Sequence, residues 1–188
     1  MSWTRPAAPA TPDAPAIYER IRSESSRGAV SNLWLTLGAD LTALEAAYSH
    51  YRTLMADPAP LTAAQAELVV LVVSATNGCG YCVAHHGPRL SKALGDEALA
   101  RAVARDYREA NLTARDRVLL DYAVALTCEP SERKLEDIER IREYGFDDRA
   151  IVRATAIVGY YNHLNRVVSA LGVELEPGVP PWEFGSQK

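Results

Sequence analysis

The chain has 188 residues, of which 48% are hydrophobic and 23% are charged, the balance of an ordinary globular protein rather than a disordered one. Its formal net charge of -4 comes from Lys and Arg scattered among Asp and Glu, which offers no basic stripe to nucleic acid. The most prominent apolar run, residues 68–73, is far shorter than the roughly 18 to 20 residues of a membrane span. These features predict a single domain with no nucleic-acid partner and no membrane partner.

The N-terminal segment, residues 1–15, differs from the rest because Pro6, Pro9, Pro12 and Pro15 interrupt it and little apolar periodicity runs through it. We expect an extended arm there, suited to lying on a neighbouring subunit. The segment also lacks the basic start and the apolar stretch of a secretory signal. This predicts a cytoplasmic protein.

From residue 16 onward, apolar residues recur at spacings of three and four, which is the pattern of helices. No stretch alternates with period two over the length of a strand, so a sheet is not expected. The sequence therefore predicts an all-α helical bundle over residues 16–176, followed by a C-terminal arm over residues 177–188. The predicted helices are separated by stop signals at Gly28, Gly38, Pro58, Asn77-Gly78, Gly95, Pro130, Gly145 and Gly172.

Two of the expected helices begin with a similar capping pattern, Thr62-Ala-Ala-Gln65 and Thr113-Ala-Arg-Asp116, each preceded by leucine. Both helices are expected to be amphipathic, and each runs toward a cysteine, Cys79 or Cys128. This likeness suggests an internal duplication, with two similar helical halves of which only the first carries a site.

The segment Cys79-Gly-Tyr-Cys82-Val-Ala-His-His86 concentrates the reactive side chains of the chain. A helix that starts near Ala63 should end at Asn77-Gly78, and a second helix should run from about Cys79 toward Leu94, with Gly95 as its cap. Pro88 should kink this second helix or end its first part just after His86.

The helical period places Cys82 about 60° and His86 about 20° from Cys79, whereas His85 lies about 120° away. His86 is therefore the predicted partner of the cysteines, because Cys82 and His86 have the i, i+4 spacing at which side chains meet. Such an imidazole can remove the thiol proton, and the N–H groups of the helix N-terminus stabilise the thiolate that results.

Two cysteines three positions apart can resolve an oxidised sulfur as an intramolecular disulfide. We expect this disulfide to join Cys79 and Cys82 and to leave Cys128 as a free thiol. Glu67, twelve positions before Cys79, reaches the pair only if the two helices fold back on each other.

Other interpretations of the cysteines remain open. A Cys-x-x-Cys pair can be half of a zinc site, but neither Cys128 nor His163 supplies a recognisable second pair, so neither metal nor cofactor is expected. The pair could also be inert core cysteines. Cys128 itself is expected to be a small core residue, and His163 could line a pocket or a subunit contact, or lie on a polar helix face.

The string Glu67-Leu-Val-Val-Leu-Val-Val-Ser-Ala-Thr-Asn-Gly-Cys-Gly-Tyr-Cys-Val-Ala-His-His86 resembles the alkylhydroperoxidase D-like group of the carboxymuconolactone decarboxylase superfamily, especially its peroxidase-related branch. The similarity extends from about Leu41 to Val173, with further matching at residues 112–117, 145–148 and 162–166. The resemblance implies an all-helical fold of two similar halves and a homo-oligomer, a dimer or higher.

The resemblance also implies roles: Cys82 as the peroxidatic thiol, Cys79 as the resolving thiol, His86 as the base and Glu67 in a proton relay. The helix dipole alone would favour Cys79 as the more acidic thiol, but the adjacent base favours Cys82. Tyr81 stands where the best-known members of the family have histidine.

The predicted function is a thiol-dependent peroxidase that reduces alkyl hydroperoxides, with a thiol or disulfide-reductase partner as electron donor. Two alternatives stay open. One is a redox-sensing or interaction protein that cycles the same disulfide without turnover. The other is a cofactor-free lactone decarboxylase-like enzyme, although that branch does not rely on a cysteine pair.

Overall fold

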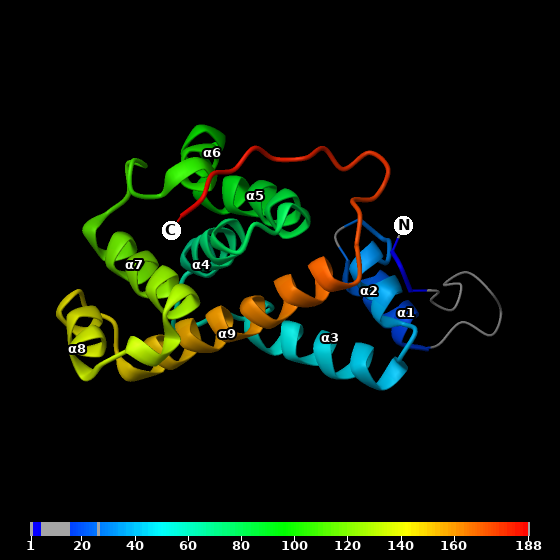
Figure 1. The fold of residues 1–188 in the computed structure, drawn as a ribbon, viewed down its shortest axis with the longest axis horizontal. Helices are drawn as coiled ribbons and strands as arrows, with labels where there is room; N and C mark the ends of the chain where they lie inside the picture. The colour runs from blue at the N-terminus through cyan, green and yellow to red at the C-terminus, as the bar shows by residue number, and fades with distance from the viewer. Residues whose placement is uncertain (1, 5–15, 26, 188) are drawn as a thin grey trace.

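A computed structural model describes residues 2–4, 16–25 and 27–187 of the chain. All regular elements in these ranges are helices, which confirms the predicted all-α class (Figure 1). The expected arm over residues 1–15 lies mostly outside the described residues. In chain order the elements are α1 (Ala16–Glu24), α2 (Asn32–Leu37), α3 (Leu41–Met55), α4 (Ala63–Thr76), α5 (Gly80–Leu94), α6 (Glu97–Asp106), α7 (Ala114–Cys128), the short 3-10 turn η1 (Pro130–Glu132), α8 (Leu135–Glu143) and α9 (Asp148–Ala170). Within the described ranges, none of these helices has the length and apolar character needed to cross a membrane.

The predicted helix ends are formed as the local sequence requires. At the start of α4, Thr62 Oγ1 accepts from the Gln65 N–H and the Gln65 side chain accepts from the Thr62 N–H, both at 3.1 Å, which is the complete capping box. At the start of α7, Thr113 Oγ1 likewise accepts from the Asp116 N–H, at 3.0 Å. Gly95 ends α5 in the left-handed conformation, at φ 67°, which glycine adopts without strain.

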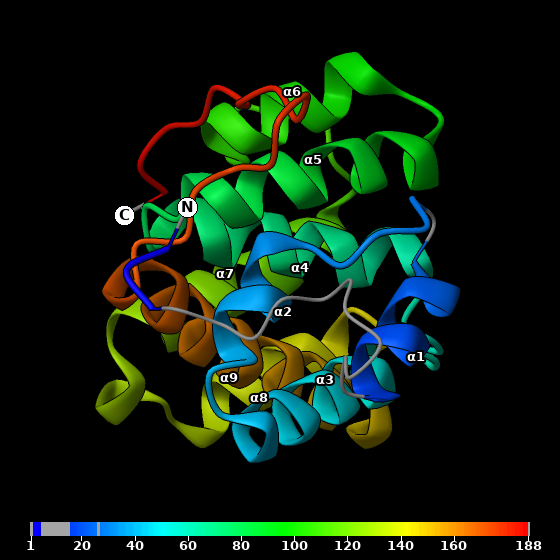
Figure 2. The ribbon, with the colours of Figure 1, turned by 90° about the vertical axis from the view of Figure 1, so that its right-hand side faces the viewer.

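Helix α4 forms the centre of the molecule, with α5, α7 and α9 packed around it (Figures 1 and 2). Every side chain from Leu68 to Ala75 is at most 2% exposed. The expectation that this helix is amphipathic is therefore wrong. Apolar residues occupy nearly every position after Ala66, so the helix has no polar face to turn toward solvent.

Helix α5 passes through Pro88 without ending, so the expected end just after His86 is wrong. Proline removes one hydrogen bond from a helix interior and crowds the preceding turn. Here the flanking residues Ala84 and Leu90 are at most 2% exposed, and their packing holds the backbone in the helix on both sides of the proline.

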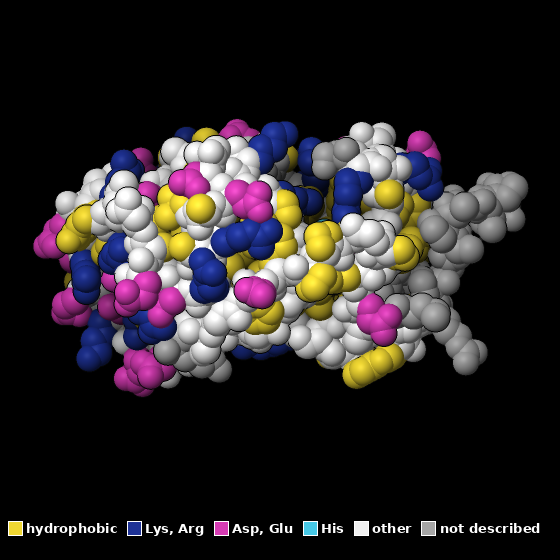
Figure 3. All heavy atoms as spheres, turned by 90° about the horizontal axis from the view of Figure 1, so that it is seen from above, with side chains coloured by type: hydrophobic (Ala, Val, Ile, Leu, Met, Phe, Trp, Pro, Cys, Tyr) yellow, Lys and Arg dark blue, Asp and Glu magenta, His cyan; other side chains and the backbone are white. Residues whose placement is uncertain are grey.

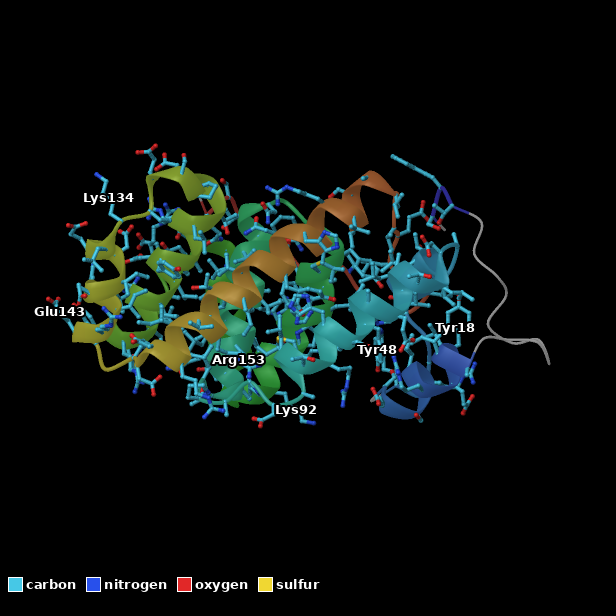
Figure 4. The ribbon with its side chains drawn as sticks, turned by 90° about the horizontal axis from the view of Figure 1, so that it is seen from below. Tyr18, Tyr48, Lys92, Lys134, Glu143 and Arg153 are labelled. Carbon is cyan, nitrogen blue, oxygen red and sulfur yellow. The ribbon has the colours of Figure 1, made fainter. Side chains whose placement is uncertain are left out.

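Helices α3 and α9 contact each other and lie on the opposite side of α4 from α5 (Figure 1). Arg153 of α9 donates to the Thr53 carbonyl at 2.7 Å and so ties the two helices together. In the middle of α3, Tyr48 lies beside the short helix α1, which carries Tyr18 (Figure 4).

After α9 the chain returns as an irregular C-terminal segment, residues 171–187, which runs over α5 and α6 (Figure 1). Seen from above, positive and negative side chains are interspersed over this face, with apolar side chains between them (Figure 3). Trp182 is only 6% exposed, and Arg101 of α6 lies 4.3 Å from its ring centroid. Gln187 is 1% exposed and donates to the carbonyls of Ala104 and Arg105. The segment therefore packs as part of the fold.

The contact between Gly87 and Trp182 yields a stability prediction. A Cβ added at Gly87 would lie 2.3 Å from the Trp182 ring, whereas one added at Gly159 of α9 would meet nothing within 4 Å. We expect Gly87→Ala to lower the free energy of unfolding by about 1 to 3 kcal/mol through overpacking. Gly159→Ala should raise it by about 0.5 to 1 kcal/mol, because alanine loses less backbone entropy in a helix.

Urea denaturation of both variants and of the parent measures these differences. The double variant Gly87→Ala/Trp182→Ala is the control for the clash, since the loss from the first substitution should shrink when the ring is absent. A Gly87→Ala variant as stable as Gly159→Ala would contradict this account of the C-terminal segment.

Candidate redox site

The two cysteines lie at the start of α5, directly after the end of α4. Gly78 turns the chain in the left-handed conformation at φ 70°, and Cys79 then becomes the N-cap residue of α5, with Cys82 in the first turn. The side chains are only 2% and 3% exposed, respectively, and both are free thiols. The structure thus holds two reduced thiols together in a site largely shielded from bulk water.

A hydrogen bond between the two sulfurs makes their acidities different. The Cys82 thiol donates to the Cys79 sulfur, which lowers the pKa of Cys79 even though burial opposes this. The same bond, together with burial, raises the pKa of Cys82 well above its usual range. Cys79, at the N-terminus of the helix, is therefore the more acidic thiol of the pair.

Asn165 of α9 is a second polar contact of the pair. Its side chain, 2% exposed, hydrogen-bonds to both cysteines and lowers the pKa of each. Its position is fixed because Nδ2 donates to Ser74 Oγ at 3.2 Å and Oδ1 accepts from Asn77 Nδ2 at 3.0 Å. An amide held this way stabilises a thiolate on either sulfur.

His86, one turn after Cys82, is linked to two other helices. Its Nδ1 lies 2.7 Å from Glu67 Oε2 of α4, and its Nε2 lies 3.0 Å from the Tyr161 hydroxyl of α9. Because a carboxylate only accepts, Nδ1 carries the proton and Nε2 is the basic nitrogen, which accepts from Tyr161. Burial lowers the pKa of His86, and Glu67 offsets this only in part. The ring is therefore neutral, and able to take a proton, at neutral pH.

A small cavity of about 50 Å³ connects these groups. Cys82, His86 and Tyr161 contribute to its wall, whereas Cys79 is not among the described residues that line it. A small molecule in the cavity therefore meets the sulfur of Cys82. The remaining wall comes from Ser31, Leu33, Trp34, Tyr51, Tyr81, His85, Arg89 and Leu164.

Glu176 of the C-terminal segment bonds to two residues that line the cavity, Tyr81 and His85. One carboxylate oxygen accepts from the Tyr81 hydroxyl at 2.8 Å and from the Asn32 N–H at 2.7 Å, while the other lies 2.8 Å from His85 Nε2. Burial alone would raise the pKa of Glu176, but these hydrogen bonds, led by that of His85, lower it to about 2. The adjacent residues His85 and His86 thus bond to two different carboxylates, those of Glu176 and Glu67.

The structure brings together the four residues predicted from sequence: Cys79, Cys82, His86 and Glu67. The folding back of α4 and α5 that Glu67 required is present. The described contacts of His86 Nε2 are with Tyr161, not with either cysteine.

Sequence reasoning missed the contacts of Tyr161, Asn165 and Glu176 at the site. Only Asn165 carried a signal, because it stands in the matching stretch 162–166. The expectation that Cys128 is a core residue is wrong: it is exposed, because it is the last residue of α7 and lies at the rim of an open groove.

His163 is exposed on a polar face of α9, as the simpler of the two interpretations held. Within the described ranges, no three His, Cys, Asp or Glu side chains are grouped so that they could hold a metal ion.

Comparison with known proteins places the site in context. The Carboxymuconolactone decarboxylase family matches residues 42–125. A peroxidase-related protein from Silicibacter sp. TM1040 is 30% identical, with 94% of this chain and 96% of that chain covered and a TM-score of 0.80. A peroxidase-related protein from Ralstonia eutropha JMP134, described as an alkylhydroperoxidase AhpD core, is also 30% identical, with 94% and 93% covered and a TM-score of 0.86.

A more distant structure shares the fold. The debrominase Bmp8, in a cysteine-to-alanine variant bound to 2,3,4-tribromopyrrole, is 18% identical with a TM-score of 0.74, and 88% of this chain and 87% of that chain are covered. No curated protein matches the chain significantly.

The bonds of Glu176 predict a pH-dependent contribution to stability. A carboxylate whose pKa falls on folding from its usual 4.5 to about 2 stabilises the fold fully above pH 4.5, and this contribution is lost as the pH falls toward 2. We expect Glu176→Gln to lower the free energy of unfolding at pH 7 by on the order of 1 to 2 kcal/mol, after allowing for screening by solvent. Urea denaturation of variant and parent between pH 7 and pH 3 measures the difference.

The difference between the two proteins should shrink as the pH is lowered, because the parent then loses the same interaction. Glu183→Gln, an exposed position on the same segment, is the matched control and should behave as the parent at each pH. A constant difference across the range would show that Glu176 does not act through its charge.

Proposed function

Because this chain belongs to the AhpD-like, peroxidase-related branch of the carboxymuconolactone decarboxylase family, we propose that it is a thiol-dependent peroxidase that reduces organic hydroperoxides. The observation that carries the proposal is the placement of the cysteine pair. Cys82 lines a cavity beside the neutral imidazole of His86, and Cys79 lies behind it within reach to form a disulfide.

Activation begins with the loss of one proton from the pair. His86 accepts this proton at Nε2, and the positive charge that it gains is stabilised by the Glu67 carboxylate at Nδ1. The Tyr161 hydroxyl rotates away from Nε2 or passes the proton on, since it both donates and accepts. The remaining proton is shared between the two sulfurs, and its shift to Cys79 leaves a thiolate on Cys82 at the cavity wall.

Peroxide reduction then follows in two balanced steps. The Cys82 thiolate attacks the terminal peroxide oxygen, the O–O bond breaks, and the alkoxide takes the proton from His86 and leaves as an alcohol. Cys82 is now a sulfenic acid. The Cys79 sulfur attacks it, and hydroxide leaves with the Cys79 proton as water, which yields the Cys79–Cys82 disulfide. An external dithiol supplies the two electrons that restore the pair.

Tyr81 takes no part in this proton transfer. Burial raises the pKa of Tyr81, and its hydroxyl is held by Glu176. It therefore stays protonated at neutral pH and acts as part of the cavity wall. In this respect the site differs from that of family members with histidine at this position.

The proposal is tested by mixing the pre-reduced protein with an organic hydroperoxide and following alcohol release and thiol loss. An enzyme consumes many equivalents of peroxide when dithiothreitol is supplied. A redox sensor that cycles the same disulfide without turnover would stop after one equivalent. Protein that loses no thiol at all would refute the proposed function.

The identity of the oxidised bond is a separate prediction. Sulfurs that already share a hydrogen bond need little backbone movement to join. We expect one equivalent of hydroperoxide to link Cys79 to Cys82 and to leave Cys128 as the single free thiol. Alkylation followed by peptide mass spectrometry identifies the bridge, and the Cys128→Ser variant should give the same product. A bridge that contains Cys128 would contradict the mechanism.

The pH dependence of single-turnover oxidation tests the base. His86→Ala should slow the reaction at pH 7 by roughly 10²-fold or more, because the pair loses its positioned proton acceptor. In the parent, the rate should rise as the pH passes the lowered pKa of His86, because the neutral ring can then accept a proton, and it should level off above that pKa. In His86→Ala the rise should occur at higher pH. Glu67→Gln should show an intermediate loss.

Two other histidines serve as comparisons for this prediction. His85→Ala should slow the reaction much less than His86→Ala, since His85 bonds to Glu176 and not to Glu67. His163→Ala, an exposed position on α9, should match the parent. If His85→Ala were the slower of the adjacent pair, the assignment of the base would be wrong.

A further inference from the structure

A second chamber, of about 220 Å³, opens beside the cysteine cavity. It is bounded by α3, by α5 and by the turn between α1 and α2, close to the position of Tyr48 in Figure 4. The walls of the two spaces are continuous, because both are lined by Ser31, Trp34, Tyr51, His85 and Arg89. We call this second space the outer chamber; it adjoins the cavity that Cys82 lines.

The described residues that line the outer chamber include three arginines, Arg27, Arg52 and Arg89, and one carboxylate, that of Glu24. Glu24 is already engaged, since Oε2 lies 3.0 Å from Arg52 Nε and accepts from the Tyr48 hydroxyl at 2.7 Å. The charge of Arg52 is thereby matched. Among the residues that the structure describes, the lining of the chamber offers no such partner to the two remaining cations, Arg27 and Arg89.

The described hydrogen bonds of these two arginines go to neutral groups. Arg89 Nη1 donates to the Tyr51 hydroxyl at 2.7 Å, and Arg27 Nη2 donates to His85 Nδ1 at 3.2 Å. Both side chains are exposed to the chamber. A guanidinium carries five N–H donors, so most of the donors of each remain for a bound anion.

Two carboxylates lie near these arginines, those of Glu67 and Glu176, but their described hydrogen bonds go to other residues. Glu67 lies close enough to influence Arg89, but its Oε2 bonds to His86. Glu176 lies on the far side of His85 from Arg27, bonded to Nε2 while Arg27 bonds to Nδ1. Each of these carboxylates is held by its own histidine.

The spacing along α5 relates the cation to the reactive sulfur. Arg89 follows Cys82 by seven residues, which is about two turns, so both point to one face and lie roughly 10 Å apart along the axis. Between them, the rings of Trp34 and Tyr51, with centroids 5.7 Å apart, provide an apolar wall. The inner cavity admits only a slim group beside Cys82.

We propose that the outer chamber binds the carboxylate of an acidic organic hydroperoxide, with Arg89 as its principal contact and Arg27 as a second one. The carboxylate pairs with the guanidinium, the hydrocarbon chain lies on the Trp34 and Tyr51 rings, and the hydroperoxide reaches Cys82. This inference rests on the proposed peroxidase function and specifies its substrate class: straight-chain hydroperoxides with a terminal carboxylate.

The test compares hydroperoxy-octanoic acid with its methyl ester, which differs in charge but keeps the same chain and peroxide. The rate constant for thiol loss of the pre-reduced protein is measured with each, and the acid-to-ester ratio is the readout. We expect a ratio of roughly 10 or more in the parent, as one charge-assisted bond would give. The ratio should fall as salt is added, because the chamber is open to solvent.

Arg89→Gln should bring the ratio close to one, and Arg27→Gln should lower it to a lesser extent. The ratio is taken within each variant, so that a general change in folding or thiol reactivity cancels. Lys92→Gln is the matched control: it removes one positive charge from the same helix, but Lys92 points outward, away from the chamber (Figure 4). Its ratio should equal that of the parent.

The outcomes separate this inference from the peroxidase proposal. Rapid thiol loss with both compounds at a ratio near one would overturn the anion site and leave the peroxidase intact. If neither compound oxidises the protein, the peroxidase proposal fails, and calorimetry with octanoate then decides about the anion site. Binding to the parent that is lost in Arg89→Gln would support the site, whereas no binding to the parent would overturn it.

Discussion

Helix α4 is apolar on every side, and this single constraint organises the molecule. A helix with no polar face must be enclosed, and α5, α6, α7 and α9 provide the enclosure. Enclosure also determines where chemistry occurs. Glu67 near the start of this helix and Ser74 near its end are carried into the interior with the apolar residues between them, so each needs a partner from a surrounding helix.

The partners that satisfy these polar groups are also the groups that can react. Glu67 is bonded by His86, and His86 by Tyr161, which yields a neutral imidazole with a defined basic nitrogen. Ser74 accepts from Asn165, whose amide faces both cysteines. Burial and reactivity are therefore linked here: the hydrogen bonds required to bury polar atoms set the protonation state of the site.

The sequence was most informative where the signal is local. The caps at Thr62 and Gly95, the separation of the helices and the shared face of Cys82 and His86 all follow from residues within one or two turns of each other. The fold class could be predicted on that basis together with family resemblance, and so could the grouping of Cys79, Cys82, His86 and Glu67 at one place in the fold. At Pro88 the local signal allowed either a kink or an end, and the end did not occur, because packing on both sides of the proline holds the helix.

The rest of the site could not be read from the sequence, because it depends on distant contacts. Tyr161 lies 75 residues from His86, and Glu176 lies 91 residues from His85. Neither stands at a spacing that any helical period relates to the cysteines. Arg89 lies on the same helical face as Cys82, but the role that we propose for it depends on the neighbouring chamber and on the contacts of the described residues there.

The position of Glu176 in the chain also has a consequence for biosynthesis. At 5 to 20 residues per second, a ribosome needs roughly 5 to 18 s to add the 91 residues between His85 and this carboxylate. During that interval the nascent chain carries both cysteines on a helix without its α9 contacts or its C-terminal cover. The two thiols then lack the cover that leaves them 2% and 3% exposed in the finished protein, so oxidants reach them more easily.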